Sequence, residues 1–301
     1  MKRFLKYVAL FCIPIVLLLL GLEYTVHKIP NSYSYKYNYV KTKGKAIRAV
    51  AIGHSQFYDN FKADEFFIPA FNLSNSAQGY MEDYYLLEKL LPSMPNLEMV
   101  ILPIGYMTVG REEQFTQKSC YYHEYMDIDY DGQIPLQYRY ECFFVRNSIK
   151  KILSYYVLHD DIVRCDSLGW SPHYINTRKY ELGHDRVIDI YTLNEGSPFF
   201  LAGEAYLFKI IDLLKKKNIK LILVSAPYYW ECYDRTNWEQ KSWIDKYIQN
   251  LCKDNPQIQH VDMEFDSTFE DEDFYDESHL SEKGSSKFIK KLNIVLSTSQ
   301  Q

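Results

Sequence analysis

The sequence lacks several patterns that point to common classes of protein. No CxxC or CxxH spacing occurs among its six cysteines, which argues against a zinc site. Positive charge is not in excess, since 34 basic side chains face 39 acidic ones, so nothing electrostatic favours nucleic-acid binding. Internal repeats and low-complexity tracts are also missing. We therefore expect no metal, no other cofactor and no nucleic-acid partner.

A cleavage site is missing after the hydrophobic N-terminal segment. Three basic residues precede an apolar run from Tyr7 to Leu22, and no small-x-small motif follows it. Extended to Val26, the run reaches the roughly 20 residues that cross a bilayer, and the basic residues favour a cytoplasmic N-terminus. We interpret residues 7–26 as an uncleaved signal anchor behind a cytoplasmic tail, residues 1–6, with the rest of the chain outside the cytoplasm. A cleaved signal peptide is the alternative, and it places the domain in the same compartment.

The cysteines leave the question of disulfides open. Cys12 lies inside the apolar run, so an odd number of cysteines remains for the folded part of the chain. Exported proteins form disulfides readily, and one or two bridges fit this compartment. Ordinary buried thiols fit it equally well.

After the anchor, short apolar strands alternate with amphipathic helices. Residues 27–44 are polar and Tyr-rich and are interpreted as a linker, and residues 45–298 as one α/β domain. We predict strands over 46–53, 67–74, 97–104, 219–229 and 258–264, and helices over 80–94, 202–218, 238–254 and 281–296.

The order of these elements predicts the fold class. Strands that alternate with helices favour a parallel sheet with crossover helices. We therefore predict a three-layer, doubly wound sheet of about five parallel strands, as in flavodoxin-like domains. Residues from about 107 to 200 interrupt the pattern and are predicted to form an insertion with one helix near 143–158.

Polar side chains follow the predicted strands at one edge of the sheet, where such folds bind ligands. The first strand leads to Ser55, the second to residues 72–77, and the fifth to an acidic loop with Asp276 and His279. A serine hydroxyl needs a base to accept its proton, and His279 is the candidate. Asp276, three residues earlier, would share one face of a helical turn with His279 and hold its imidazole. Backbone amides of Ser55 and of the loop 72–77 would stabilise an oxyanion.

Each of these residues also has a purely structural explanation. Ser55 and Asp276 are residue types that cap helices, and His279 stands where a helix is expected to begin. Their joint position at one sheet edge favours the chemical interpretation over three separate structural ones.

Together these segments resemble the SGNH (GDSL-like) hydrolases. The stretch that includes Asp276 and His279 reads "YDESHLSEKG" and is similar to the D-x-x-H-L-x-x-x-G block of the membrane-anchored, exported branch, which includes alginate and teichoic-acid acylation proteins. The resemblance covers residues 47–105 and 219–296. It implies an SGNH-like α/β domain with Ser55 as nucleophile, His279 as base and Asp276 as its orienting partner. Ala77 stands where the family usually has its oxyanion glycine.

Two positions depart from the family pattern. His54 occupies the place of the usual aspartate before the serine, and residues 103–108 contain no asparagine where the family has an oxyanion donor. Asn75 or Tyr106 is a speculative replacement for that donor.

The resemblance implies an exported, membrane-anchored serine esterase or O-acyltransferase. Its partners would be an acylated glycan or acyl donor of the cell envelope, the membrane, and a membrane-bound acyl-transfer protein. One alternative is a catalytically degenerate SGNH-fold protein that binds or assembles envelope polysaccharide machinery. Another is a metal-dependent phosphoesterase, suggested by the many acidic residues in 262–278.

Overall fold

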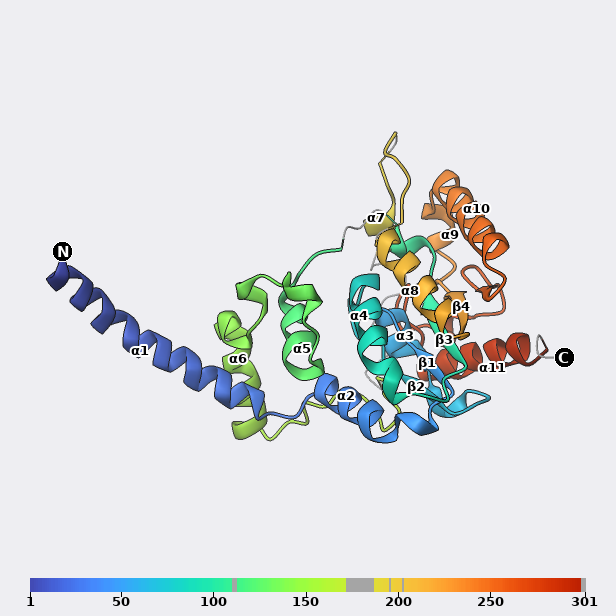
Figure 1. Ribbon diagram of the computed structural model, residues 1–301. Helices are drawn as coiled ribbons and strands as arrows, with labels where there is room; N and C mark the ends of the chain where they lie inside the picture. The colour runs from blue at the N-terminus through green and yellow to red at the C-terminus, as the bar shows by residue number, and fades with distance from the viewer. Residues whose placement is uncertain (110–112, 172–186, 195, 202, 299–301) are drawn as a thin grey trace. The chain divides into compact units, whose positions relative to one another are not determined.

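The computed structural model describes residues 1–109, 113–171, 187–194, 196–201 and 203–298. The chain forms two compact units (Figure 1). Unit 1 combines Met1–Asn38 with Gln114–Arg164, and unit 2 combines Tyr39–Glu113 with Cys165–Gln301. Much of the predicted insertion thus belongs to unit 1, while residues 110–112, 172–186 and 195 of that insertion lie outside the described residues.

Unit 2 is built on a sheet of five parallel strands, so the predicted fold class is confirmed. The strands are β1 (Ala49–Ala51), β2 (Ala70–Asn72), β3 (Met99–Pro103), β4 (Lys220–Ser225) and β5 (Ile258–Asp262). Their order, β2-β1-β3-β4-β5, is that of doubly wound flavodoxin-like sheets. Nearly every strand residue up to β4 is buried, as expected for a sheet with helices on both faces.

Helices cover both faces of this sheet (Figure 1). One face is covered by α3 (Ser55–Asn60) and α11 (Glu282–Thr298), whose phenylalanines join the main apolar cluster; the Phe57 and Phe288 rings lie 6.3 Å apart. The other helices of the sheet layers are α4 (Tyr80–Leu90), α8 (Glu204–Lys216) and α10 (Trp238–Asp254). Of these, α4 packs on α8, α8 on β4 and α10 on β5.

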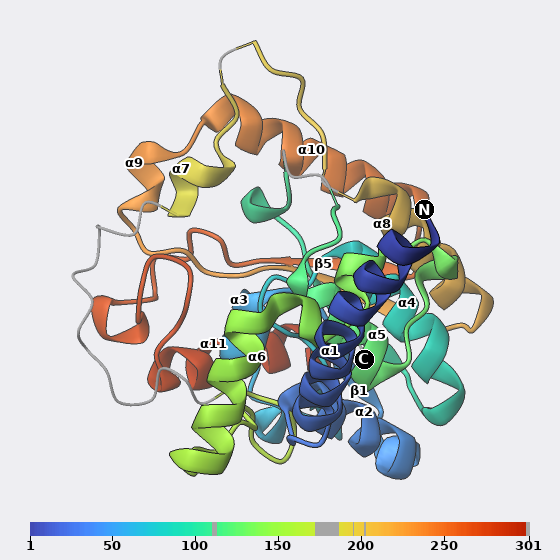
Figure 2. The same ribbon diagram turned by 90° about the vertical axis from the view of Figure 1, so that its left-hand side faces the viewer.

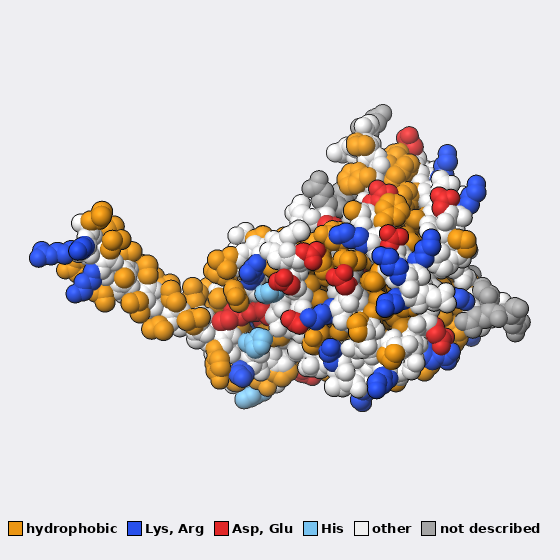
Figure 3. All heavy atoms as spheres, viewed as in Figure 1, with side chains coloured by type: hydrophobic (Ala, Val, Ile, Leu, Met, Phe, Trp, Pro, Cys, Tyr) orange, Lys and Arg blue, Asp and Glu red, His pale blue; other side chains and the backbone are white. Residues whose placement is uncertain are grey.

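Unit 1 contains α1 (Lys2–His27), α5 (Gln117–Met126) and α6 (Val145–Ile152). Helix α1 is long and apolar enough to cross a membrane, and its hydrophobic side chains are exposed along most of its length. Lys and Arg side chains gather at its N-terminal end (Figure 3). The N-terminal helix is therefore suited to act as a membrane anchor or signal anchor.

The segment predicted to be a linker is largely helical. Helix α2 (Ser32–Lys43) begins in unit 1 and ends in unit 2. Its C-terminal part is anchored in unit 2, since the Tyr39 ring stacks on Phe71 at 4.4 Å and Val40 is buried. Tyrosines supply apolar surface that a count of aliphatic residues overlooks, which is why the sequence pattern gave no helical period here.

All six cysteines lie in the described part of the chain, and none of them forms a disulfide. Cys120, Cys142 and Cys232 are buried, and burial raises the pKa of each of these thiols. The sequence left open whether these cysteines form disulfides or remain thiols, and in the structure they are thiols.

Asn72, at the end of β2, fixes the short helix α3 to the sheet. Its buried side-chain amide donates to the carbonyl oxygens of Phe57 (2.7 Å) and Phe61 (3.0 Å), at the C-terminal end of α3. The side-chain oxygen of Asn72, Oδ1, accepts the Ser74 backbone N–H at 3.0 Å. The Phe57 carbonyl also accepts the Phe61 N–H at 2.9 Å, whereas the Phe61 carbonyl lies beyond the last turn of the helix, and there the Asn72 side chain supplies the partner.

We expect Asn72→Ala to lower the free energy of unfolding by about 2–4 kcal/mol, because it leaves buried backbone groups without partners. Urea denaturation of the detergent-solubilised chain measures this change. The matched control is Asn96→Ala, whose side chain makes one exposed hydrogen bond to the Lys45 carbonyl. Equal effects of the two substitutions would contradict the role given to Asn72.

Candidate active site

A tight turn after β1 presents Ser55 at the start of α3. Gly53 has φ +114°, and a Cβ atom there would overlap the ring of Pro103, so only glycine fits this turn without strain. His54 is the N-cap residue of α3, and its Nδ1 accepts the Gln56 backbone N–H at 3.4 Å. His54 thus caps the helix, and the Ser55 side chain is half-buried with no capping bond. A capping role does not account for Ser55.

Asp276 and His279 form a close pair, but their local structure differs from the expected helical turn. They lie in a loop between a 3-10 turn and α11, closed by an isolated bridge between Phe274 and Leu280. Helix α11 begins only at Glu282. The spacing of three residues still brings the side chains together, because the loop turns back on itself and the Asp276 N–H donates to the His279 carbonyl at 3.3 Å.

The Asp276 carboxylate holds both the His279 ring and the turn itself. His279 Nδ1 lies 2.9 and 2.8 Å from the two carboxylate oxygens, so this nitrogen carries the proton that the carboxylate accepts. The backbone N–H groups of Ser278 and His279 donate to the same carboxylate at 2.9 and 2.8 Å. In the neutral imidazole, Nε2 is then the basic nitrogen.

These contacts set the ionisation of Asp276. Burial alone would raise the pKa of its carboxyl group, but the hydrogen bond and charge of His279 and the two backbone N–H groups outweigh burial. The pKa of Asp276 therefore lies below its ordinary value of 3.8. The carboxylate stays charged at neutral pH and stabilises positive charge on the imidazole.

The other nitrogen of His279 faces α3. Nε2 lies 3.8 Å from the carboxylate of Asp59, which is four residues after Ser55 on the same helix. Residues four apart share one face of a helix, so His279 approaches the face that carries Ser55. Within the described residues, no hydrogen bond joins Ser55 Oγ to His279.

A buried asparagine connects the two elements. Asn60, the last residue of α3, accepts the backbone N–H of Leu280 at 2.9 Å and is fully buried. The residue next to His279 is thereby fixed to the helix that begins with Ser55. This contact sets the distance between the two candidate residues.

The loop after β2 lies beside the Ser55 turn. The Asn75 N–H donates to the Gly53 carbonyl at 3.1 Å and so joins the two loops. Gly53 is two residues before Ser55, and Asn75 is two residues before Ala77. Ala77 is exposed with φ +57°, a left-handed conformation that suits glycine best. In the described part of the chain, neither the Ser55 N–H nor the Ala77 N–H has a protein acceptor. Both amides are available to a ligand.

The two speculative side-chain donors are engaged elsewhere. Asn75 is buried, and its amide donates to Gln78 Oε1 at 3.1 Å and more weakly to the Leu73 carbonyl. The Tyr106 hydroxyl accepts the Asn237 N–H at 3.0 Å and contacts Thr192 Oγ1 at 3.1 Å. Burial raises the pKa of Tyr106. Neither group is directed at the Ser55 turn by these bonds.

Three groups near the site, Asp59, Asn60 and Glu277, were not anticipated from the sequence. Asp59 could have been found from its helical spacing to Ser55, but Asn60 gave no signal because its partner is 220 residues away. Glu277 is fully buried beside the Asp–His pair, and Arg235 forms an ion pair with it. The contact between Glu277 and Arg235 likewise forms only through the tertiary fold, so nothing in the sequence indicated it.

The acidic segment 262–278 is neutralised mainly by lysines. Glu264, Asp266 and Asp273 lie 3.0, 2.7 and 2.5 Å from Lys241, Lys291 and Lys287 respectively. Burial raises the pKa of Glu264 to about 7, against the attraction of Lys241. Over the residues that the structure covers, no group of three or more His, Cys, Asp or Glu side chains is placed to hold a metal ion.

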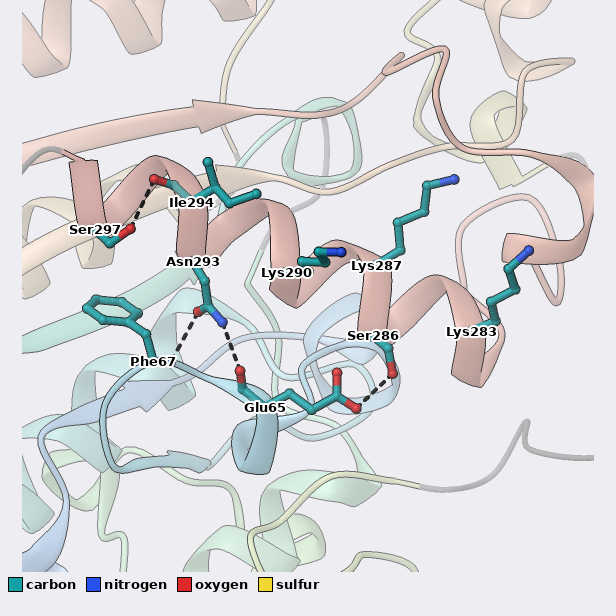
Figure 4. Close-up of a pocket in the computed structure, with 9 residues that line it drawn as sticks. All are labelled: Glu65, Phe67, Lys283, Ser286, Lys287, Lys290, Asn293, Ile294 and Ser297. Atoms are coloured by element: carbon teal, nitrogen blue, oxygen red, sulfur yellow. Dashed lines mark hydrogen bonds between the residues drawn. The ribbon is translucent and has the colours of Figure 1, made fainter.

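A cavity of about 690 Å³ lies along α11 (Figure 4). Lys283, Lys287 and Lys290 border it together with Phe67 and Ile294. Two of these lysines already pair with carboxylates of the acidic segment. None of the candidate catalytic residues lines this cavity.

Comparisons with known proteins add little to this geometry. No family model matches the sequence, and no curated protein matches it. A solved structure described as "The structure of a putative platelet activating factor from Streptococcus pneumonia" matches with a TM-score of 0.42 and 14% identity, over 96% of this chain and 99% of that one. A similarity this low establishes neither a family nor an activity.

The depressed pKa of Asp276 predicts a pH-dependent contribution to stability. A carboxyl group whose pKa is lower in the folded state contributes stability that is complete above its unfolded value and is lost as pH falls through the folded value. The difference in unfolding free energy between the wild type and Asp276→Asn should therefore be largest above about pH 5 and shrink below pH 3.8. Urea denaturation between pH 3 and 7 checks this. A difference that does not change with pH would show that the Asp276 charge is not engaged.

Proposed function

We propose that the chain is an exported, membrane-anchored serine esterase or O-acyltransferase that acts on acyl esters of a cell-envelope or exported glycan. Ser55 is the nucleophile and His279 is the base. Asp276 orients the His279 ring and stabilises positive charge on it. The observation that carries the proposal is the His279 ring, held by Asp276 at Nδ1 while Nε2 faces the side of α3 that bears Ser55. The residue pattern also resembles that of SGNH hydrolases, apart from His54 and the lack of an asparagine in residues 103–108.

The proposed reaction has two steps. Ser55 Oγ attacks the acyl carbonyl carbon as His279 Nε2 takes its proton, and the tetrahedral oxyanion faces the Ser55 and Ala77 amides. The C–O bond to the leaving alcohol then breaks, and that alcohol receives the proton from His279. Water or a sugar hydroxyl next attacks the acyl-enzyme by the same proton route and releases Ser55.

Ser55 and His279 must approach each other for this chemistry. Catalytic hydrogen bonds are often long without substrate and shorten in the complex. Asn60 fixes the end of α3 to the residue after His279, and the proposal requires the Ser55 side chain to reach His279 Nε2 when substrate binds.

Exposed aromatic rings beside the His279 loop support a glycan substrate. Trp230, Tyr233 and Trp238 are 57%, 52% and 45% exposed, and the last two rings lie 4.4 Å apart. Their segment is bound to the His279 loop, since the Tyr229 N–H donates to the Glu277 carbonyl at 2.9 Å. Indole and phenol rings stack on the apolar faces of sugars while their polar atoms stay hydrated.

The anchor supports action at the membrane. Basic residues at the start of α1 favour a cytoplasmic N-terminus and place the chain that follows α1 on the outer side. There the enzyme would meet membrane-bound acyl donors and a membrane-bound acyl-transfer partner.

A non-catalytic binding role in polysaccharide assembly is the second candidate. It is favoured by the engaged amide of Asn75, which is therefore not directed at an oxyanion beside Ser55. Such a donor contributes about 3 kcal/mol to the barrier in enzymes that have one.

Hydrolysis of a chromogenic acyl ester, and release of acyl groups from an O-acetylated glycan, test the proposal on the full chain in lipid nanodiscs. We expect Ser55→Ala and His279→Ala each to lower the rate about 10³-fold or more. Ser297→Ala, at the exposed end of α11, is the matched serine control and should leave the rate unchanged. A wild-type chain inactive on every ester and glycan tried, or active without Ser55, would favour the binding role.

A further inference from the structure

Helix α6 in unit 1 carries a row of apolar side chains that are about half exposed among the residues that the structure describes. Val145, Ile149, Leu153 and Val157 recur every four residues along α6 and the π turn that follows it. They are 45%, 46%, 48% and 61% exposed. We call these four residues the α6 apolar row. A soluble surface seldom shows so regular a series, which is typical of an interaction site.

The other sides of α6 are accounted for. Ser148 is buried and donates to the Glu141 carbonyl at 2.8 Å, and Lys151 forms an ion pair with Glu141 at 2.7 Å. Arg146 and Lys150 are exposed beside the apolar row, and α6 contains no acidic residue. The helix therefore has a protein-facing side, an exposed apolar side and an exposed basic border.

The end of α1 lies next to this helix within the same unit. Helix α1 packs against α6 and against the 3-10 turn before it, and both views show α6 beside the C-terminal end of α1 (Figures 1 and 2). The Cys142 N–H donates to Glu23 Oε2 at 2.7 Å, and the Tyr125 hydroxyl donates to the Val26 carbonyl at 3.3 Å. These bonds fix the exit of α1 to the folded part of unit 1.

The length of α1 places this junction at the membrane surface. Its side chains are largely exposed from Phe4 to Leu20, and its first polar bond to the rest of unit 1 is at Glu23. The 20 residues from Phe4 to Glu23 span about 30 Å at 1.5 Å per residue, which is about the thickness of the hydrocarbon core. Hydrophobic side chains cover the visible side of α1 up to this junction (Figure 3). The α6 apolar row is therefore next to the boundary between acyl chains and headgroups.

We propose that α6 is a second membrane contact, lying in the interface with its apolar row among the acyl chains of phospholipids. Arg146 and Lys150 then face the phosphate groups, as basic residues do on interfacial helices. The lipid surface is the occupant that these observations favour, because the row is continuous with a helix suited to span the same bilayer. This inference rests on insertion of α1 and is independent of the chemistry at Ser55.

Such a contact would add a function that a single anchor lacks. One transmembrane helix lets a domain rotate and tilt freely, whereas a second contact at the lipid surface fixes unit 1 against the membrane. Unit 1 would then hold the chain that leaves it at a constant distance from the membrane surface.

Introduced tryptophans test the proposal in the full chain, reconstituted into nanodiscs of phosphatidylcholine with or without bromine on its acyl chains. Leu153→Trp reports on the row, and Asn147→Trp reports on an exposed polar position of the same helix. Leu17→Trp, on the exposed part of α1, reports on the anchor. The emission of the parent chain, with its four tryptophans, is subtracted.

We expect brominated lipid to quench Leu153→Trp and Leu17→Trp comparably and to leave Asn147→Trp unquenched. Circular dichroism confirms folding, and Ile149→Trp replaces Leu153→Trp if that variant misfolds. Quenching of Leu17→Trp without quenching at the row would show that the row lies outside the acyl chains, and would overturn the proposal. Absence of quenching at Leu17→Trp would overturn it too, because α1 would then lie outside the bilayer.

Discussion

The candidate site depends on one short helix whose C-terminal end is fixed by buried polar groups. Asn72 binds the last carbonyl groups of α3 to the edge of the sheet, and Asn60 binds α3 to the loop that contains His279. A helix of six residues has little stability of its own. Its position, and with it the position of Ser55, therefore comes from these two asparagines and from the phenylalanines packed beneath them.

The same constraint explains how residues from the two ends of unit 2 form one site. Parallel strands bring the turn after β1 and the loop after β2 to the same edge, and the Asn75 N–H joins them at Gly53. The loop that contains His279, near the other end of unit 2 in the sequence, then packs at the same edge. The Asp276 carboxylate in this loop stays ionised because it accepts hydrogen bonds, not because it is exposed to water. The catalytic proposal follows from this arrangement of rigid loops, and the membrane proposal from a separate unit.

Sequence reasoning reached the sheet and the pairing of Asp276 with His279, because strand order and a spacing of three residues are local signals. It failed where structure depends on contacts between distant segments. The expected helical turn at His279 is a loop, since the turn is closed by Leu280 and by the helix that ends at Asn60. The expected linker is helical because tyrosines pack on unit 2. No spacing rule could have indicated Asn60, whose importance lies entirely in its partner.

Labelling with a fluorophosphonate tests the central claim most directly, namely that His279 activates Ser55. The serine oxygen would attack phosphorus, form a P–O bond and displace fluoride, and mass spectrometry would locate the adduct. The account predicts one dominant adduct, on Ser55, that forms in the wild-type chain in nanodiscs and is lost in His279→Ala. Labelling of other serines with none at Ser55, or equal labelling of Ser55 in His279→Ala, would contradict it.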